Sequence, residues 1–414
     1  MTASLGTLGP RIIDLAQRLA AFSDTRDGLS CTYLMPAHRA AASQLAEWMA
    51  AAGMTVEIDG VANVVGRYPA AQPDARTVMI GSHYDTVINA GNFDGRLGIL
   101  TGLVAIEALN AAHRRLPFNI ELVAFSEEEG VRFSAPYIGS SAVAGRFDFR
   151  LLERRDASGI SLGEVISKSG HNPDEIPAIA RDPRQLAGYL EVHIEQGPVL
   201  LGEGLPVGVV TAIAGAARYS VTVTGEAGHA GTVPMGLRHD AAAAAAEIVL
   251  FVERRCSGIP TLVGTVGRLQ VPGGAMNVIP GRCELSLDIR AGDDGTRDAA
   301  IADVLAEIDL IAKRRGVRIE AKEMQRAPAV ACSGRVQSLF ADAIGRAGLP
   351  VRALPSGAGH DAVQFGHLTD MGMLFVRCGN GGISHSPLET MTAADADVAV
   401  HVLLDVLEHF QETR

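Results

Sequence analysis

Two hydrophobic patterns alternate along the first half of the chain. Apolar residues recur at helical spacing over residues 12–22, 37–52 and 97–112. Short apolar or alternating runs predict strands at residues 55–58, 63–68, 78–81, 118–125 and 189–197. Asp59-Gly60, between the first two strands, predicts a hairpin. Strands that alternate with helices in this way predict an α/β fold.

The pattern changes between about residues 211 and 325. The elements predicted there are a strand, a helix, two strands, a helix and a strand, at residues 217–224, 238–256, 261–269, 283–290, 296–314 and 317–321. This β-α-β-β-α-β order is the ferredoxin-like arrangement. The α/β alternation then resumes with a helix, two strands and a closing helix, at residues 336–347, near Val351, at 373–376 and at 393–410. We therefore predict one domain made of residues 1–210 and 327–414, interrupted by a smaller inserted domain at 211–326.

Composition limits the classes of function that the chain can have. A chain of 414 residues is long enough for two domains, and its net charge of -11 argues against nucleic acid or an anionic membrane surface as partner. The five cysteines are odd in number and form no C-x-x-C pair, which indicates reduced thiols in the cytoplasm. Neither a signal peptide nor a membrane-spanning run is visible. We expect a soluble cytoplasmic protein that acts on a small molecule.

Metal-ligand side chains gather where the predicted strands end. Gly81-Ser82-His83-Tyr84-Asp85 ends one strand, and Asp94 follows in the same glycine-rich loop. Glu127-Glu128-Glu129 directly follows the strand at 118–125, His193 lies in the next strand, and His385 lies in a glycine-rich loop near the end of the chain. A charge run is usually a solvated surface, but three adjacent carboxylates behind a buried strand are costly without a cation. Because open α/β sheets carry their chemistry at these strand ends, we expect the groups to converge.

Three imidazoles and two carboxylates can hold two divalent ions if one carboxylate bridges them. Asp94 is the natural bridge, because its loop lies between His83 and the later ligands. We predict that His83, Asp94 and His193 hold one ion, and that Asp94, Glu128 and His385 hold the other. The donor set accepts zinc and manganese alike. Two such ions lower the pKa of a water and polarise a carbonyl.

Hydrolysis at this site also needs a base. Glu127, one residue before the predicted ligand Glu128, is predicted to take the proton from the water and return it to the leaving nitrogen. Glu129, or solvent exposure of the whole triplet, is the rival interpretation. Asp85 is predicted to hold the second ring nitrogen of His83, or else to stabilise the turn.

Taken together, these segments resemble the hydantoinase/carbamoylase branch of the dinuclear metallopeptidase and acylase superfamily. The resemblance covers essentially the whole chain. The matching motifs are Gly81-Ser82-His83-x-Asp85-Thr86 with Asp94-Gly95, Glu127-Glu128-Glu129-Gly130-x-Arg132-Phe133, His193-x-Glu195-Gln196-Gly197-Pro198 and Ile383-Ser384-His385-Ser386-Pro387. The resemblance implies a mixed-sheet catalytic domain with an inserted dimerisation domain that acts as a lid. It also implies two divalent ions per subunit, with the ligands and the base as predicted above.

The resemblance further implies substrate-binding residues that composition does not reveal. His229, in Gly228-His229-Ala230-Gly231-Thr232, matches a histidine that reaches into the partner subunit's site, which implies a homodimer. Asn277 and Arg290 match binders of a substrate carboxylate, and an arginine offers a planar fork for that group. Gln196 and Gly359 match further substrate contacts. Without the resemblance, each of these residues would be interpreted as a turn, cap or surface group.

Members of this branch hydrolyse ureido or carbamoyl nitrogens on compounds that carry a carboxylate. Ser82-His83-Tyr84-Asp85-Thr86-Val87 and Tyr137-Ile138-Gly139-Ser140 are most similar to the allantoate group, so allantoate is the expected substrate. N-carbamoyl-L-amino acids and N-carbamoyl-β-alanine, the β-ureidopropionase substrate, are the alternatives. A dinuclear aminopeptidase or deacylase would share the metal site but lack the pairing of Asn277 with Arg290. A binding module without activity would have lost ligands or the base, and all are present.

Overall fold

The computed structural model describes residues 7–411, which form two compact units. The first unit comprises residues 7–211, 332–354 and 360–411, and the second comprises residues 212–331 and 355–359. The second unit extends beyond residue 326 because the short strand β14 (Val330–Ala331) pairs with Ile213 and Ala212. It also includes residues 355–359, where the backbone N–H of Ala214 donates to the carbonyl of Ser356.

The helices and strands predicted for the first unit are confirmed within a few residues. Its longer helices are α1 (Gly9–Ala20), α2 (Pro36–Ala51), α3 (Arg96–Ala111), α10 (Gly334–Arg346) and α11 (Ala393–His409). Its strands are β1 (Thr55–Ile58), β2 (Val64–Tyr68), β3 (Thr77–His83), β4 (Asn119–Phe125), β5 (Leu186–Ile194), β6 (Val207–Ile213), β15 (Ala353–Ser356) and β16 (Met371–Val376). The sequence did not predict β6, nor the short helices α4 (Ile138–Val143), α5 (Leu162–Lys168), α6 (Ile176–Ile179) and α7 (Val199–Glu203).

A mixed sheet organises this unit and confirms the predicted α/β class. Its strand order is β1-β2-β4-β3-β5-β16-β6, with the short strands β14 and β15 also paired to β6. The four central strands β4, β3, β5 and β16 are parallel, and β2 and β6 flank them in antiparallel pairs. The carboxyl ends of the four parallel strands therefore meet at one edge of the sheet.

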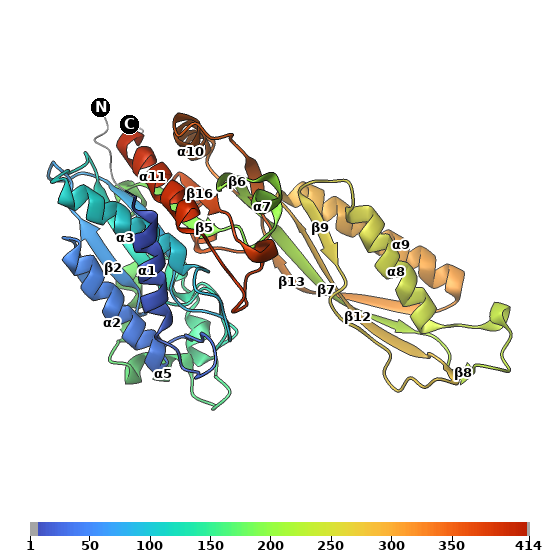
Figure 1. Cartoon of the computed structure of the whole chain (residues 1–414). Coiled ribbons are helices and arrows are strands. Elements are labelled where there is room, and N and C mark those ends of the chain that lie inside the picture. Colours follow the sequence, from blue (N-terminus) through green and yellow to red (C-terminus); the bar gives the residue numbers. More distant parts are fainter. Residues whose placement is uncertain (1–6, 412–414) are drawn as a thin grey trace. The chain divides into compact units, whose positions relative to one another are not determined.

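The two faces of this sheet are covered differently. Because side chains alternate along a strand, Leu190 and Val192 join the core formed with α1, α2, α3, α10 and α11, and Tyr189 and His193 point to the opposite face. Helices α1, α3 and α11 pack against one another in that core (Figure 1). On the opposite face the rings of Phe125, Tyr189 and Phe365 stack. His83 and His193 lie at or next to the carboxyl ends of β3 and β5.

The second unit has the predicted ferredoxin-like order. Its elements are β7 (Gly215–Thr224), β8 (Gly228–His229), α8 (Ala241–Cys256), β9 (Leu262–Thr265), β10 (Leu269–Gln270), β11 (Val278–Ile279), β12 (Arg282–Ala291), α9 (Asp294–Arg315) and β13 (Arg318–Ala327). The antiparallel sheet runs β10-β12-β7-β13, with β9 also paired to β12. Helices α8 and α9 bury one face of this sheet, and polar side chains occupy the other. The predicted single strand at 261–269 is split into β9 and β10, and the strand expected near Val351 begins at Ala353.

Two further predictions concern the whole chain. All five cysteines are free thiols and buried, in agreement with the absence of a disulfide pattern. Among residues 7–411, no helix has the length and apolar character required to cross a bilayer.

Candidate metal centre

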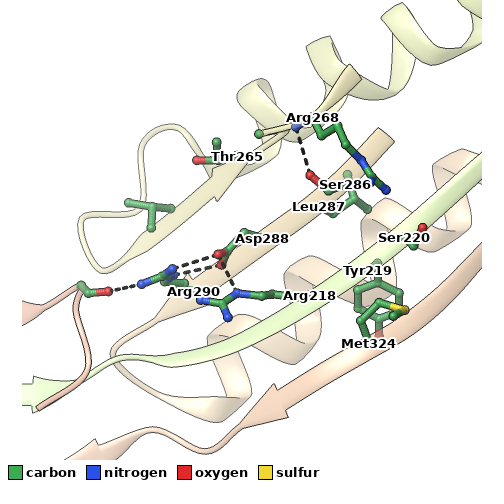
Figure 2. Close-up of a pocket in the computed structure, with 13 residues that line it drawn as sticks. Arg218, Tyr219, Ser220, Thr265, Arg268, Ser286, Leu287, Asp288, Arg290 and Met324 are labelled. Carbon is green, nitrogen blue, oxygen red and sulfur yellow. Dashed lines mark hydrogen bonds and ion pairs between the residues drawn. The ribbon is translucent and has the colours of Figure 1, made fainter. Parts of the chain in front are cut away.

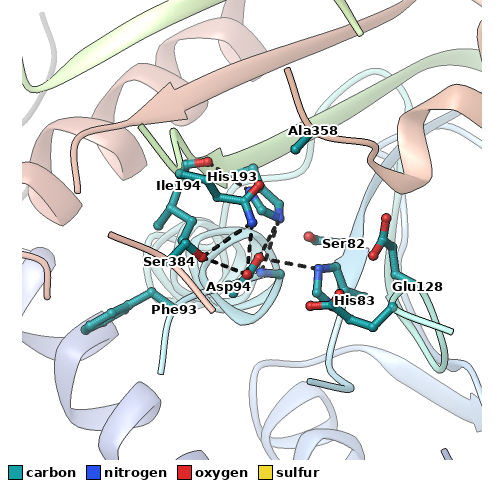
Figure 3. A network of polar contacts seen from close by, with 12 residues as sticks. Ser82, His83, Phe93, Asp94, Glu128, His193, Ile194, Ala358 and Ser384 are labelled. Carbon is teal, nitrogen blue, oxygen red and sulfur yellow. Dashed lines mark hydrogen bonds and ion pairs between the residues drawn. The ribbon is translucent and has the colours of Figure 1, made fainter. Parts of the chain in front are cut away.

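The parallel strands bring the predicted ligands to one edge of the sheet. His83 is the last residue of β3, His193 precedes the last residue of β5, and the glutamate triplet begins two residues after β4. Asp94 lies in the loop between β3 and α3, and His385 lies in the loop that follows β16. Figure 3 shows that His83, Asp94, Glu128 and His193 face one another.

Asp94 lies at the centre of the cluster and is 3% exposed. Its Oδ1 is 3.4 Å from Nε2 of His193 and 3.8 Å from Nε2 of His83. Its Oδ2 is 3.1 Å from Nε2 of His385. One carboxylate oxygen thus faces two imidazoles and the other faces a third, so Asp94 would contribute to ligand groups on both of its sides.

His193 has the tautomer that a metal ligand needs. Its Nδ1–H donates to the carbonyl of Ile194 over 2.9 Å, and its Nε2 accepts the N–H of Gly95 over 3.2 Å. Burial lowers the pKa of His193 to about 4, so the ring stays neutral and keeps a lone pair toward Asp94. Gly95 has φ +67°, and a Cβ on it would lie 2.4 Å from the ring of His83. Only glycine therefore allows the backbone to pass this close to the imidazole.

The ligand atoms form more than one group. His83, Asp94 and His193 have ligand atoms within 4.8 Å of one another, as predicted for the first ion. The prediction placed Glu128 with Asp94 and His385; in the structure Glu129 groups with these two residues, and Glu128 as their partner stays a prediction. Oε1 of Glu129 is 3.6 Å from Nε2 of His385. Glu128 instead groups with His83 and Glu129, so it adjoins the cluster from the His83 side.

Glu127, the predicted base, is enclosed beside the clustered ligands. It is fully buried, and neither carboxylate oxygen has a hydrogen-bond partner among residues 7–411. It belongs to none of the groups of metal-ligand atoms found in this part of the chain. Burial, followed by the charges of Asp85 and Glu129, raises the pKa of Glu127 well above its ordinary value. Glu127 therefore lies where the charges of Asp85, Glu129 and His83 act on it, and its role as the base stays a prediction.

Asp85 and His38 fix the turn that carries the glutamates. The carboxylate of Asp85 accepts the backbone N–H groups of Glu128 and Glu129 over 3.0 and 3.2 Å. The Nδ1–H of His83 donates to the backbone carbonyl of Asp85, and Oδ1 of Asp85 lies 3.4 Å from the same nitrogen. On the other side, Nε2–H of His38 donates to the carbonyl of Ser126 over 2.6 Å. The turn is thus held at both ends, and Asp85 links it to His83.

The site concentrates buried acids that a cation would stabilise. Burial and the charge of Asp94 raise the pKa of Glu129 to about 7, and burial likewise raises the pKa of Glu128 well above its usual range. Nearby, burial and the charge of Asp361 raise the pKa of Glu191 to about 8. Burial also raises the pKa of Asp361 to about 7. Buried carboxylates of this number, next to imidazole nitrogens, are the chemical environment that a divalent ion fits.

Four residues around the cluster were not predicted from the sequence. Ser384 donates to Oδ2 of Asp94 over 2.9 Å and contacts Oε2 of Glu389 at 3.0 Å, and Glu389 accepts the N–H of Phe93 over 2.7 Å. Glu191 groups with His193 and His360. Ser384 and Glu191 had a sequence signal, because each lies within two residues of a predicted ligand, and so had His360, which follows the predicted contact Gly359.

The predicted substrate-binding residues divide between the two units. In the first unit, the amide of Gln196 donates to Oδ2 of Asp94 over 2.9 Å, from a backbone with φ 56°. A positive φ in a residue other than glycine is strained and is often found at functional sites. His229, Asn277, Arg290 and Gly359 belong to the second unit. There β8 pairs with β11, so that the N–H of Ala230 donates to the carbonyl of Asn277 beside His229.

Comparison with known proteins identifies the class to which this fold and site belong. The mixed sheet with histidines and carboxylates at its strand ends is the architecture of a metal-dependent hydrolase, and the model of peptidase family M20/M25/M40 matches residues 79–409. The chain belongs to this family, and its similar structures place it in the hydantoinase/carbamoylase branch. It is therefore a hydrolase, and the resemblance found in the sequence is confirmed.

Three similar proteins show how far the likeness extends along the chain. An N-carbamoyl-L-amino acid amidohydrolase of Geobacillus stearothermophilus is 43% identical over 88% of this chain and 89% of its own length. Allantoate deiminase 1 of Glycine max is 40% identical over 94% of this chain and 87% of its own length. The crystal structure of a hydantoinase/carbamoylase family amidase from Burkholderia multivorans superposes with a TM-score of 0.93 at 32% identity, over 99% of this chain and 100% of that one.

Proposed function

We propose that the protein is an amidohydrolase that cleaves the ureido C–N bond of a carboxylate-bearing compound, with allantoate as the preferred substrate. Both similar enzymes named above act on compounds of this kind by their names. The observation that carries the proposal is the position of Asp94, whose two oxygens face His193 and His385 respectively. A carboxylate in that position supports the paired ions that a poorly electrophilic urea carbonyl requires.

The proposed ligands are those predicted from the sequence. His83, Asp94 and His193 hold one ion, and Asp94, Glu128 and His385 hold the other, with Glu129 beside the second group. When bound, two zinc or manganese ions polarise the ureido carbonyl and lower the pKa of a water. Asp85 keeps His83 in the ligating orientation by accepting from its other nitrogen.

Glu127 is the acid/base in this assignment. It is fully buried beside Asp85, Glu129 and His83, and it is not itself a member of a ligand group among the described residues. Burial raises the pKa of Glu127, which suits a carboxylate that must first accept a proton and then release it. It accepts the proton of the attacking water and delivers it to the nitrogen that leaves. The overall reaction converts R–NH–CO–NH₂ and water into R–NH₂, ammonia and carbon dioxide.

The second unit supplies recognition of the carboxylate in this proposal. Arg290 and Asn277 bind the carboxylate of the substrate, and Gln196, His229 and Gly359 contribute further contacts. His229 acts in the site of a partner subunit, so the protein is a homodimer through its inserted domain. Large apolar side chains left exposed on this unit, including Met276 at 104% and Met235 at 77%, support such an interface. The free thiols support a cytoplasmic location.

Ammonia release tests the function directly. Purified protein loaded with manganese or zinc is given allantoate, N-carbamoyl-L-methionine, N-carbamoyl-β-alanine and a dipeptide in parallel. We expect ammonia from the ureido compounds, fastest from allantoate, and no cleavage of the dipeptide. Faster turnover of the N-carbamoyl amino acid would make this class the preferred substrate, in line with the name of the Geobacillus enzyme. Cleavage of the dipeptide without ammonia release from any ureido compound would make the protein a peptidase instead.

A further inference from the structure

The open face of the sheet in the second unit contains a cavity of about 660 Å³ (Figure 2). Its charged lining consists of Arg218, Arg268 and Arg290 against the single acid Asp288. The formal charge of this lining is therefore about +2, which favours an anion. All of these residues lie on β7, β10, β12 or the loop before β10, within one rigid sheet.

Asp288 and Arg290 form a two-point pair on strand β12. Nε of Arg290 donates to Oδ1 of Asp288, and NH2 donates to Oδ2, both over 2.9 Å. Two parallel hydrogen bonds fix both the plane and the direction of a guanidinium. NH1 of the same arginine donates to the carbonyl of Gly357 over 2.8 Å, so the plane is also held at its far end.

Asp288 has a second cation beside it. Nε of Arg218, on the neighbouring strand β7, donates to Oδ2 of Asp288 over 3.0 Å. NH1 of Arg218 donates to Gln325 on β13 over 2.7 Å, which anchors it across the sheet. Burial alone would raise the pKa of Asp288, but the hydrogen bonds and charges of Arg290 and Arg218 lower it, so the carboxylate stays ionised.

The contacts of Asp288 with Arg290 and with Arg218 have opposite effects on the charge that faces the cavity. An acid next to Arg290 orients the guanidinium but would cancel its charge and repel an incoming carboxylate. Arg218 offsets that charge, so the three groups together remain cationic. From this geometry we propose that Asp288, backed by Arg218, is the positioning residue that holds Arg290 ready for the carboxylate of the substrate. The inference rests on the proposed function for the role of Arg290, and it adds the device that makes that arginine effective.

Kinetics test the inference with a matched control on the same strand. Asp288→Asn removes one half of the ionic fork at nearly constant shape, and should raise KM about 10-fold with kcat and metal content unchanged. Arg218→Gln should raise KM about 3-fold, because only the backing charge is lost. The control is Glu284→Gln, because Glu284 pairs with Arg282 two residues away on β12 and lies outside the cavity. An equal rise of KM in the control would overturn the inference.

The proposed role of Asp288 requires both a substrate carboxylate and Arg290, so a second assay tests each requirement. The assay compares N-carbamoyl-L-methionine with its carboxamide. Asp288→Asn should raise KM for N-carbamoyl-L-methionine and leave KM for the carboxamide unchanged. It should cause no further rise of KM when Arg290→Ala is already present. A loss that is equal for both compounds, or that adds to the loss from Arg290→Ala, would show that Asp288 acts independently of the arginine.

A crystal structure of Asp288→Asn separates this inference from the proposed function. We expect the guanidinium of Arg290 to lose its single orientation, while β12 and Arg282 stay as they are. A guanidinium that keeps the same plane contradicts the positioning role of Asp288, whatever the enzyme cleaves. If the wild-type protein releases no ammonia from any ureido compound, the proposed function fails and the crystal structure still decides the positioning role.

Discussion

Glu127, Glu128 and Glu129 are chemically identical, but their surroundings differ. Glu127 is enclosed next to Asp85, Glu128 lies beside His83, and Glu129 reaches Asp94 and His385. The sequence shows three carboxylates behind a strand but not how the chain turns there. Since successive side chains point in different directions, an error of one residue exchanges a ligand for a base. The turn is set by the contacts of Asp85 and His38, which are distant in sequence.

Replacing each glutamate of the triplet by glutamine separates the three roles. Glu127→Gln should lower kcat by about 10² to 10⁴ with metal content retained, because a base is lost and no ligand is. Glu128→Gln should lower the metal content of the purified protein, and Glu129→Gln should change kcat and metal content less than either. Metal analysis and steady-state kinetics of the three variants distinguish the roles. Loss of metal in Glu129→Gln, with metal retained in Glu128→Gln, would make Glu129 the ligand instead.

Arg290→Ala tests carboxylate recognition. Removing the charged fork should raise KM about 10-fold or more and leave the metal content unchanged, because no metal ligand is altered. Arg282→Ala, on the same strand and paired with Glu284, is the control and should behave as wild type. A normal KM in Arg290→Ala would remove this arginine from the site.

At the scale of elements, periodicity predicted most helices and strands, and failures occurred where periodicity carries little information. Strand β6 is a short apolar run, Val207–Ile213, that no alternation distinguishes from a buried loop. The predicted strand at 261–269 breaks at Val266-Gly267-Arg268, where pairing with β12 stops and restarts. The convergence of ligands followed from the parallel strands, whereas Glu191, His360 and Glu389 depend on packing between segments far apart in the chain.

Helix α2 contributes a buried histidine whose ionisation tests how that helix supports the site. Burial lowers the pKa of His38 to about 4, against an ordinary value near 6.5. Between these values the unfolded chain binds a proton that the native state excludes, so stability falls as the pH falls below about 6.5. At pH 5 the loss from this residue should be about 2 kcal/mol.

Urea unfolding of metal-free protein at pH 7.5 and pH 5 measures this loss. His38→Gln keeps an N–H donor for Ser126 but does not titrate, so the variant should lose less stability between the two pH values than the wild type. Equal losses in both proteins would mean that His38 is protonated in the native state.

At the scale of the whole molecule, the proposed homodimer makes a prediction that a monomer cannot meet. Glu128→Gln and His229→Asn should each be inactive alone. Mixed by reversible unfolding in equal amounts, they should regain about a quarter of wild-type activity, because each mixed dimer has one intact site. Light scattering should show a particle of two chains. Two inactive variants that stay inactive after mixing, in a particle shown to be a dimer, would place His229 in its own subunit's site.

The pairing of β5 with β16 has a consequence for synthesis of the protein. Tyr189 lies opposite Met371, so the strand that completes the central sheet leaves the ribosome only after the whole second unit has been made. Until then the nascent chain exposes the apolar edge of β5 to neighbouring chains. We expect folding of the first unit to be slow and to benefit from chaperones, and fragments that stop before Met371 to aggregate even though they contain four of the five proposed metal ligands.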